Sequence, residues 1–314
     1  MRVLFAASPA IAIPSLEALC KTEGVELAGV LTNPDTSKGR HGTPLPTEIG
    51  EAAEKICAHV SVLKPHKLDA AAREQVSSLK PELLVTFAYG RIFGPKFLAL
   101  FPLGGINIHP SLLPKYRGPS PIQAAILNRD TETGITVQTL AQEMDSGDIL
   151  TRENLRLTGS ETAGSLGEIM AQKAAVILPE VLKNIAAGKA CAQPQDHSKA
   201  TYCSLFTRDN GLIGWKMSAA EIEARIRAFY PWPLCRTIHG GRELYILKAE
   251  VYLGDALNGK PGQVVGIDKQ AGILIQTGDG ILAVTELQYQ GKKALFWRDF
   301  LNGARDFINA QLGS

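Results

Sequence analysis

Residues 83–109 read LLVTFAYGRIFGPKFLALFPLGGINIH, and this stretch sets the architecture of the first half of the chain. It holds two apolar runs of strand length, Leu83–Phe87 and Gly105–His109. Similar runs upstream alternate with segments of helical periodicity. Further strands are predicted at Arg2–Ala6, Glu26–Leu31 and Val60–Leu63, and helices at Ile11–Lys21, Thr47–Cys57, Ala70–Leu79 and Pro121–Leu127. Apolar strands separated by helices are typical of an open, mostly parallel sheet covered on both faces. The predicted fold class is therefore α/β, with a Rossmann-like doubly wound sheet.

The second half of the chain changes in character. Strands at Thr133–Thr139 and Asp148–Leu157 and a long helix at Thr162–Ala187 complete the first part. Residues 189–206 show little periodicity and indicate a linker. After it come a helix at Ala219–Phe229 and short strands at Glu243–Lys248, Gln263–Ile267, Ile273–Thr277 and Ile281–Leu287, separated by glycine-rich turns. Such spacing favours a small β-barrel of the OB-like kind. We predict domains at 1–188 and 207–314, joined by the linker 189–206.

Composition excludes several classes of protein. The chain has 314 residues, 45% of them hydrophobic and 20% charged, which is enough apolar material for two cores and excludes a disordered chain. The 33 basic and 31 acidic residues leave a net charge of +2, a weak sign by itself of a nucleic-acid partner. No apolar run approaches the 18 residues of a membrane span. The five cysteines are widely spaced and form no C-x-x-C, which argues against a disulfide framework or a zinc site and favours the cytoplasm.

The strand Gly105–His109 brings two polar side chains together at its end. Because side chains alternate along a strand, Asn107 and His109 share one face, and Pro110 then ends the ladder. Open α/β sheets bind ligands at the carboxyl ends of their strands. We expect two more segments, residues 89–91 and the loop 143–148, to open onto this edge.

An amide, an imidazole and a carboxylate at one edge suit acyl transfer without a covalent intermediate. The amide and a protonated imidazole can stabilise an oxyanion, and the carboxylate of Asp145 can help to remove a proton from an attacking amine. Two plainer interpretations remain open at this point. The pair Asn107 and His109 can be a hydrogen-bonded loop anchor, and Asp145 can be a turn residue. Ser111 has no evident base, so nucleophilic catalysis is not indicated.

The block Asn107-Ile-His-Pro-Ser-Leu-Leu-Pro-Lys-Tyr-Arg-Gly-Pro-Ser-Pro-Ile-Gln123 closely resembles the signature of the folate-dependent formyltransferases. The segments 134–137 and 144–150 resemble the second block of that family, and 228–233 and 271–282 resemble its carboxyl-terminal domain. Within the family, the chain is similar to members that formylate methionyl-tRNA. The resemblance implies 10-formyltetrahydrofolate as co-substrate, initiator methionyl-tRNA as acceptor, no metal, and a C-terminal domain that binds tRNA. We expect a monomer.

The resemblance also implies residue roles. The catalytic residues would be Asn107, His109 and Asp145. The folate site would be lined by Ser111, Leu112, Leu113 and Pro114 and flanked by Phe87, Ala88, Tyr89 and Gly90. The loop 33–46 is rich in proline, glycine and basic residues, so it is either a solvated surface loop or, as in the family, a contact to the tRNA acceptor end through Lys38, Arg40 and His41. Gly42 and Thr43 stand where the family usually has two lysines.

Three other functions are compatible with parts of the sequence. A formyltransferase that acts on an amino sugar nucleotide would share both blocks, although the loop and Pro119–Gln123 favour the tRNA enzyme. A barrel-bearing RNA-binding protein would not need the trio Asn107, His109 and Asp145. A dinucleotide-dependent oxidoreductase would need a G-x-G-x-x-G turn, which the first turn, Phe5–Ala10, lacks.

Overall fold

Residues 1–37, 42–255 and 257–313 are described by the computed structural model, and they form two units. The first unit comprises Met1–Pro121, Glu132–Arg156 and Gly167–Ser204. The second comprises Ile122–Thr131, Leu157–Leu166 and the chain from Leu205 onward. The boundaries predicted at 188 and 206 stay a prediction, while the contacts of the described residues group the segment from Gly167 to Ser204 with the first unit.

A seven-stranded sheet forms the centre of the first unit, in the order β5-β2-β1-β6-β7-β8-β9. The strands are β1 (Arg2–Ala7), β2 (Glu26–Leu31), β5 (Ser61–Leu63), β6 (Leu83–Phe87), β7 (Gly105–His109), β8 (Glu132–Thr139) and β9 (Ile149–Arg156). The first five of these are parallel to their neighbours, and β8 and β9 are antiparallel additions. The prediction of a mostly parallel α/β sheet is confirmed.

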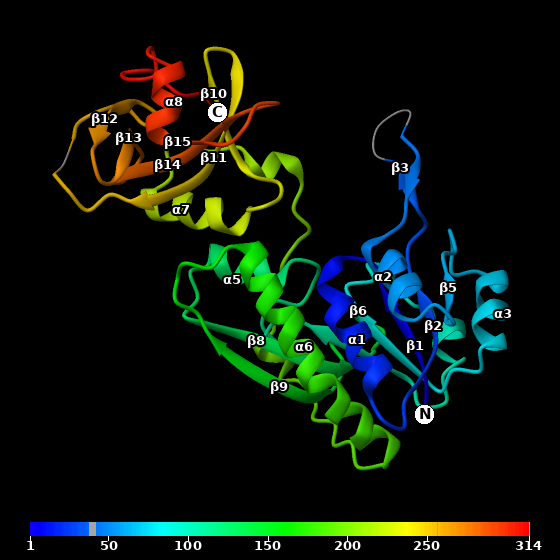
Figure 1. Ribbon diagram of the computed structural model, residues 1–314. Helices are drawn as coiled ribbons and strands as arrows, with labels where there is room; N and C mark the ends of the chain where they lie inside the picture. The colour runs from blue at the N-terminus through cyan, green and yellow to red at the C-terminus, as the bar shows by residue number, and fades with distance from the viewer. Residues whose placement is uncertain (38–41, 256, 314) are drawn as a thin grey trace. The chain divides into compact units, whose positions relative to one another are not determined.

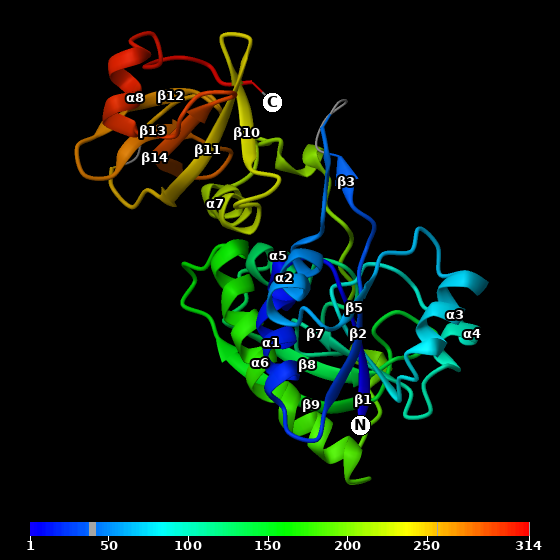
Figure 2. The same cartoon turned by 45° about the vertical axis from the view of Figure 1, so that its right-hand side comes forward.

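Helices cover both faces of this sheet (Figures 1 and 2). They are α1 (Ile13–Lys21), α2 (Glu48–Ile56), α3 (Ala70–Ser78), α4 (Pro95–Leu98) and α6 (Ala163–Ala186), with short 3-10 turns η1 (Ala10–Ala12) and η2 (His197–Lys199). The helix α5 (Pro121–Leu127) falls almost wholly in the second unit. Local sequence explains two of the starts: the side chain of Thr47 accepts from the Gly50 amide at α2, and that of Asp69 accepts from the Ala72 amide at α3. Each cap satisfies an amide that the first helical turn leaves unpaired.

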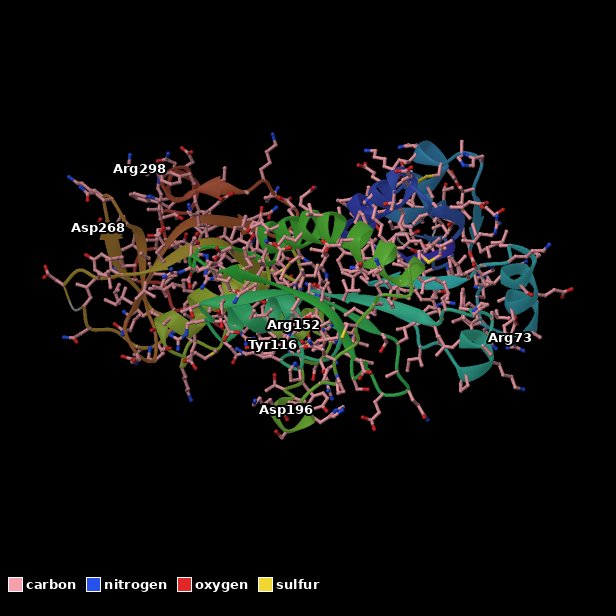
Figure 3. All side chains as sticks on the ribbon, turned by 90° about the horizontal axis from the view of Figure 1, so that it is seen from below. Arg73, Tyr116, Arg152, Asp196, Asp268 and Arg298 are labelled. Carbon is pink, nitrogen blue, oxygen red and sulfur yellow. A yellow bond between two sulfur atoms is a disulfide. The ribbon has the colours of Figure 1, made fainter. Side chains whose placement is uncertain are left out.

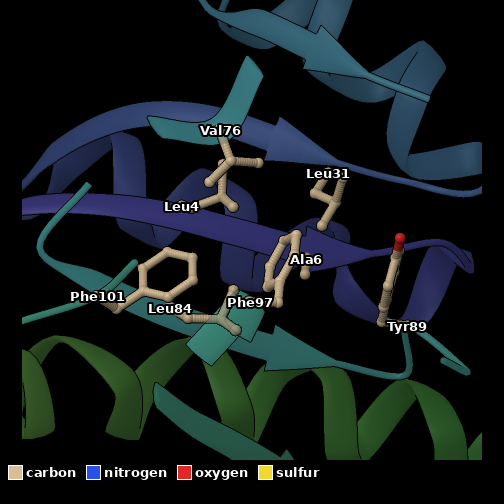
Figure 4. Close-up of a cluster of buried hydrophobic side chains, with 8 residues drawn as sticks. All are labelled: Leu4, Ala6, Leu31, Val76, Leu84, Tyr89, Phe97 and Phe101. Atoms are coloured by element: carbon tan, nitrogen blue, oxygen red, sulfur yellow. The ribbon is translucent and has the colours of Figure 1, made fainter. Parts of the chain in front are cut away.

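One apolar core lies between the sheet and the helices α3 and α4, and Figure 4 shows its buried side chains. They are Leu4, Ala6, Leu31, Val76, Leu84, Tyr89, Phe97 and Phe101. Half of them come from predicted strands, namely Leu4, Ala6, Leu31 and Leu84. The strands are apolar on both faces because each face is covered by helices.

The structure corrects the expectation about cysteines. Cys20 of α1 and Cys57, the residue that follows α2, form a disulfide. The two residues are 37 positions apart, and only the packing of α1 beside α2 brings them together. The odd number and wide spacing of the cysteines therefore argue against a framework of several disulfides, but they do not tell whether a single pair is bonded.

The second unit is built on antiparallel strands and two helices. Its elements are η3 (Arg208–Gly211), α7 (Ala219–Ala228), β10 (Cys235–His239), β11 (Arg242–Val251), β12 (Val264–Asp268), β13 (Gly272–Gln276), β14 (Ile281–Tyr289), β15 (Leu295–Phe296) and α8 (Trp297–Gly303). The sheet order is β10-β11-β14-β13-β12, with β15 beside β14. The predicted C-terminal β-domain is confirmed, although the sequence did not indicate β10, β15 or α8.

The C-terminal segment joins the two edges of this sheet. Gly313 pairs with Ile238 of β10, and Gln311 pairs with Gln263 beside β12. The amide of Val264 also donates to the carbonyl of Ala310 at 2.9 Å. An edge strand exposes unpaired backbone groups, so this segment satisfies both edges and closes the sheet as a barrel does.

Two further elements lie between β2 and α2 in the first unit. The strands β3 (Thr36–Ser37) and β4 (Pro44–Leu45) pair with each other in antiparallel fashion. The loop residues 38–41 lie outside the described residues.

Candidate active site

The strand β7 delivers Asn107 and His109 to the same edge of the sheet. In the register, Asn107 lies between Thr86 of β6 and Gln138 of β8. The side chain of His109 is nearly buried, and Asn107 is partly exposed. The alternation expected from the sequence therefore holds, with both polar groups on one face at the end of a central strand.

The connection between β8 and β9 brings Asp145 to these two residues. Its Oδ1 accepts a hydrogen bond from Nδ2 of Asn107 at 3.3 Å and lies 3.6 Å from Nδ1 of His109. Its Oδ2 accepts from the backbone amide of Gly118 at 2.8 Å. The structure thus brings the three residues Asn107, His109 and Asp145 together.

Backbone contacts determine which nitrogen of His109 can exchange a proton. Nε2 lies 2.8 Å from the carbonyl oxygen of Tyr116, and a carbonyl only accepts. Nε2 therefore carries the hydrogen in the neutral ring, which leaves Nδ1 as the basic atom that faces Asp145. A proton taken up at Nδ1 would sit beside a carboxylate.

A second contact fixes the orientation of the Asn107 amide. The hydroxyl of Thr86 donates to Oδ1 of Asn107 at 2.6 Å, so the amide nitrogen is turned toward Asp145. The amide carries two N–H groups. One of them donates to Asp145, and the other can donate a hydrogen bond to a developing oxyanion.

The segment 111–114 lies next to this trio, with its side chains divided between the interior and the surface. Ser111 and Leu113 are fully buried, whereas Leu112 and Pro114 are partly exposed. The hydroxyl of Ser111 donates to the carbonyl of Lys115 at 2.6 Å, which holds the loop together. Of the four residues expected at the folate site, only Leu112 and Pro114 present side-chain surface outward.

The segment 87–90 follows β6 at the same edge of the sheet. Phe87 and Tyr89 are buried, and Tyr89 stacks on Phe93. Ala88 and Gly90 are exposed, with φ angles of 52° and 77°. The alternation means that this segment offers its backbone, rather than its aromatic rings, to the edge. The hydroxyl of Tyr89 is buried and makes no hydrogen bond within the described part of the chain, and burial raises the pKa of Tyr89.

Three residues at the site were not singled out from the sequence. The amide of Gln138 donates from Nε2 to Oδ1 of Asp145 at 2.9 Å, and its side chain is buried in β8, a strand that reads ETGITVQT. Gln195 donates to the carbonyl of Asp145 at 2.8 Å. Arg117 is 2% exposed and donates to Gln195. Gln138 is one of several polar residues in β8, so nothing in the sequence distinguishes it, and nothing marks Gln195.

Cys203 also lies at this edge. Its thiol is 3.4 Å from the carbonyl oxygen of Arg117. Burial raises the pKa of the Cys203 thiol, and the negative charge of Asp145 raises it further, while a hydrogen bond with the Ser120 backbone lowers it. The thiol is therefore held in its neutral form.

Some predictions cannot be placed on this geometry. Lys38, Arg40 and His41 lie outside the described residues. Within residues 1–37, 42–255 and 257–313, the side chains form no group of three or more His, Cys, Asp or Glu that could hold a metal ion. Over the same ranges, no helix combines the length and hydropathy needed to cross a bilayer.

Comparison with known proteins places the chain in a family. The model described as "Formyl transferase" matches residues 1–182, and the one described as "Formyl transferase, C-terminal domain" matches residues 206–305. A methionyl-tRNA formyltransferase from Treponema denticola is 47% identical over 319 aligned positions, which cover 98% of each chain. One from Borrelia duttonii is 40% identical over 309 positions, again covering 98% of each.

Solved structures share the fold at lower identity. HypX from Aquifex aeolicus, in complex with tetrahydrofolic acid, has a TM-score of 0.64 and 18% identity; the match covers 98% of this chain and 48% of that one, so this chain spans about half of HypX. An N-formyltransferase from Helicobacter canadensis, in complex with folinic acid and dTDP-3-aminofucose, has a TM-score of 0.63 and 21% identity, with 90% and 97% covered. The sequence block around Asn107, the two family models and the full-length relatives agree: this chain belongs to the formyl transferase family, among relatives of the methionyl-tRNA formyltransferases.

Proposed function

We propose that this protein transfers the formyl group of 10-formyltetrahydrofolate to the free α-amine of methionine esterified to initiator tRNA. The observation that carries the proposal is the convergence of Asn107, His109 and Asp145 at one strand end. An amide donor, an imidazole and a carboxylate are the groups that a direct acyl transfer needs.

The reaction would proceed by direct attack. The α-nitrogen of methionine forms a bond to the formyl carbon, and the carbonyl oxygen becomes an oxyanion that the free N–H of Asn107 can stabilise. The amine loses a proton to Nδ1 of His109 or to Asp145, which lie 3.6 Å apart. The bond from the formyl carbon to N10 of the folate then breaks, and N10 receives a proton. Contacts of this kind are often long before substrate binds.

The residues present fit a folate at this edge. The exposed residues Ala88 and Gly90 can offer backbone groups to the flat, hydrogen-bonding ring of a pterin. The partly exposed Leu112 and Pro114 would supply apolar contact on the other side. These residues would bind and orient the co-substrate, and the transferred carbon is the folate's own.

The acceptor would be held by the second unit and the loop 33–46. Support for tRNA comes from the relatives at 40% and 47% identity, which are named methionyl-tRNA formyltransferases. We propose that Lys38, Arg40 and His41 contact the acceptor end of the tRNA. A cytoplasmic monomer remains our expectation for the form in which the protein acts.

A direct assay tests the proposal. The purified protein is incubated with 10-formyltetrahydrofolate and charged initiator methionyl-tRNA, and N-formylmethionine is measured after the ester is hydrolysed. The same tRNA with its α-amine acetylated is the negative control, and dTDP-3-aminofucose is the competing acceptor. We expect formylation of methionyl-tRNA alone. Formylation of the sugar nucleotide with none of the tRNA would overturn the choice of acceptor.

A further inference from the structure

Gln195 is the one buried side chain in an exposed stretch. Its residue is 5% exposed, while residues 191–194 and 196–199 on either side are all exposed. Figure 3 shows the segment, with Asp196 labelled at its outer side. A polar carboxamide is costly to bury unless its groups are hydrogen-bonded.

The backbone on either side of Gln195 is hydrogen-bonded to the rest of the first unit at two places. On one side, Gln193 and Ile149 exchange hydrogen bonds between their backbones at 2.8 and 2.9 Å. On the other, the carbonyl of Thr201 accepts from the amide of Arg117, and the amide of Cys203 donates to the Arg117 carbonyl, both at 2.8 Å. The segment is therefore held at one end beside β9, the strand that follows the Asp145 loop, and at the other end beside Arg117.

Between these two places, the side chain of Gln195 is hydrogen-bonded to the loop that carries Asp145. Its Nε2 donates to the carbonyl oxygens of Asp145 at 2.8 Å and Gly147 at 2.7 Å. Asp145 has a φ of 54°, a left-handed backbone conformation that residues other than glycine seldom adopt. Such a conformation persists only where surrounding contacts hold it.

The same amide is part of a chain of hydrogen bonds with a single direction. Arg117 can only donate, and its Nε and Nη2 both reach Oε1 of Gln195, at 3.2 and 2.7 Å. Gln195 is therefore oriented with its nitrogen toward the two loop carbonyls and toward Oε1 of Gln138, at 3.1 Å, so three oxygens share the two hydrogens of this amide. That in turn directs Nε2 of Gln138 to Oδ1 of Asp145, at 2.9 Å.

We propose that Gln195 and Gln138 are positioning residues for Asp145, and that the donor-only guanidinium of Arg117 sets the orientation of both amides. The inference rests on the proposed function, because it assumes that the Asp145 carboxylate takes part in formyl transfer. It assigns a role in the active site to a residue of the predicted linker. Without Gln195, the Asp145 loop would lose two backbone anchors and Gln138 would lose the bond that fixes its amide.

The variant Gln195→Glu tests this inference in the full-length protein. The new carboxylate has the same shape and can still accept from Arg117, but it cannot donate to the loop or to Gln138. We expect kcat to fall by about 10²-fold, the loss that a misplaced catalytic group causes. The KM values for folate and tRNA should stay within about twofold, because the side chain of Gln195 is buried and faces the Asp145 loop.

Gln193→Glu is the matched control. It makes the same chemical change two residues away, on an exposed side chain, and we expect the wild-type kcat. A wild-type kcat in folded Gln195→Glu would overturn the inference, and so would an equal loss in both variants. If the wild-type enzyme itself fails to formylate methionyl-tRNA, the proposed function fails instead, so the two failures are distinct.

A second variant covers the case in which Gln195→Glu does not fold. Gln138→Met removes the final donor to Asp145 and leaves the bonds between Arg117, Gln195 and the loop carbonyls in place. We expect a lower kcat with unchanged KM values. In single-turnover reactions, Gln138→Met should add no further loss to Asp145→Ala, because both act on the same group. Additive losses, or a wild-type kcat in Gln138→Met, would contradict a role that acts through Asp145.

Discussion

Nδ2 of Asn107 donates a hydrogen bond to Oδ1 of Asp145 at 3.3 Å, although 38 residues separate them along the chain. The contact joins the end of a central parallel strand to a loop between two antiparallel strands. Asp145 also accepts a hydrogen bond from the backbone amide of Gly118, and its carboxylate faces His109. Its carboxylate is therefore the point at which several segments of the first unit meet.

His109→Gln separates the two functions of the imidazole. The glutamine amide can take the place of Nε2 and donate to the Tyr116 carbonyl, but it offers no base in place of Nδ1. We expect kcat to fall by at least ~10²-fold, while the melting temperature and KM values change little. Turnover close to the wild-type rate would remove His109 from the mechanism.

Thr86→Val tests the orientation of the Asn107 amide. Valine has a similar shape but cannot donate to Oδ1 of Asn107, and an unpaired buried acceptor costs ~1–3 kcal/mol. The amide then keeps its bond to Asp145 but loses the contact that holds its oxygen in place. We expect kcat to fall roughly tenfold, on the scale of ~1.4 kcal/mol per factor of ten.

The control for this change is Thr133→Val, which alters a buried threonine of β8 away from the trio. Steady-state kinetics of both variants, with melting temperatures, check the prediction. Equal losses of activity in the two variants would mean that Thr86 acts on strand packing rather than on Asn107.

Gly118→Ala should affect both stability and rate. Gly118 has a φ of 114°, and an added Cβ would lie 2.3 Å from the carbonyl oxygen of Cys203. Strain of this kind costs ~1–3 kcal/mol, and relief of the clash would move the amide that donates to Asp145. We expect a lower melting temperature and a lower kcat. Gly214→Ala, whose Cβ would meet only Met217 atoms at 3.7 and 3.8 Å, should be close to neutral in calorimetry and in the assay.

Alkylation with iodoacetamide should distinguish the cysteines. The exposed Cys191 should react first, and Cys203 more slowly, because burial raises its thiol pKa and only the thiolate reacts. Burial raises the pKa of Cys235 from 9.0 to about 12, so Cys235 should stay unmodified in the folded protein. Cys20 and Cys57 should react only after reduction of their disulfide. Mass spectrometry of the labelled peptides measures each site.

The raised pKa of Cys235 predicts how the free energy of unfolding depends on pH. The buried thiol of Cys235 holds its proton to a higher pH than the unfolded chain does. Its contribution to stability is therefore complete below pH 9.0 and is lost as the pH rises toward about 12. Denaturant titrations of wild type and Cys235→Ala across this range should show a shallower alkaline decline in the variant. An equally steep alkaline loss of stability in wild type and variant would contradict this role of Cys235.

Arg40→Ala tests the loop that the sequence assigns to tRNA. We expect it to raise the KM for methionyl-tRNA without changing folate binding, because only the tRNA carries the phosphates that an arginine would meet. The wild-type KM for tRNA should also rise with salt concentration, and less steeply in the variant. An equal loss of tRNA and folate binding would show that the loop acts in another way.

Much of this protein follows from its sequence alone. Buried strands such as Leu83–Phe87 and Gly105–His109 are predicted with their observed bounds, because a strand covered on both faces is a continuous apolar run. Alternation along one strand is enough to place Asn107 beside His109. In the second unit, the short strands β10 and β15 and the helix α8 lack such patterns, since tertiary packing decides them.

Tertiary structure alone decided the contacts between distant segments. Chain folding brought Asp145 to Asn107, joined Cys20 to Cys57, and inserted Gln195 beneath the Asp145 loop. Periodicity reports which face of a strand or helix is buried, and it is a local property of the chain. A hydrogen bond between two loops depends instead on how whole elements pack, and a single polar residue in an exposed segment carries no sign of the partner that folding will bring to it.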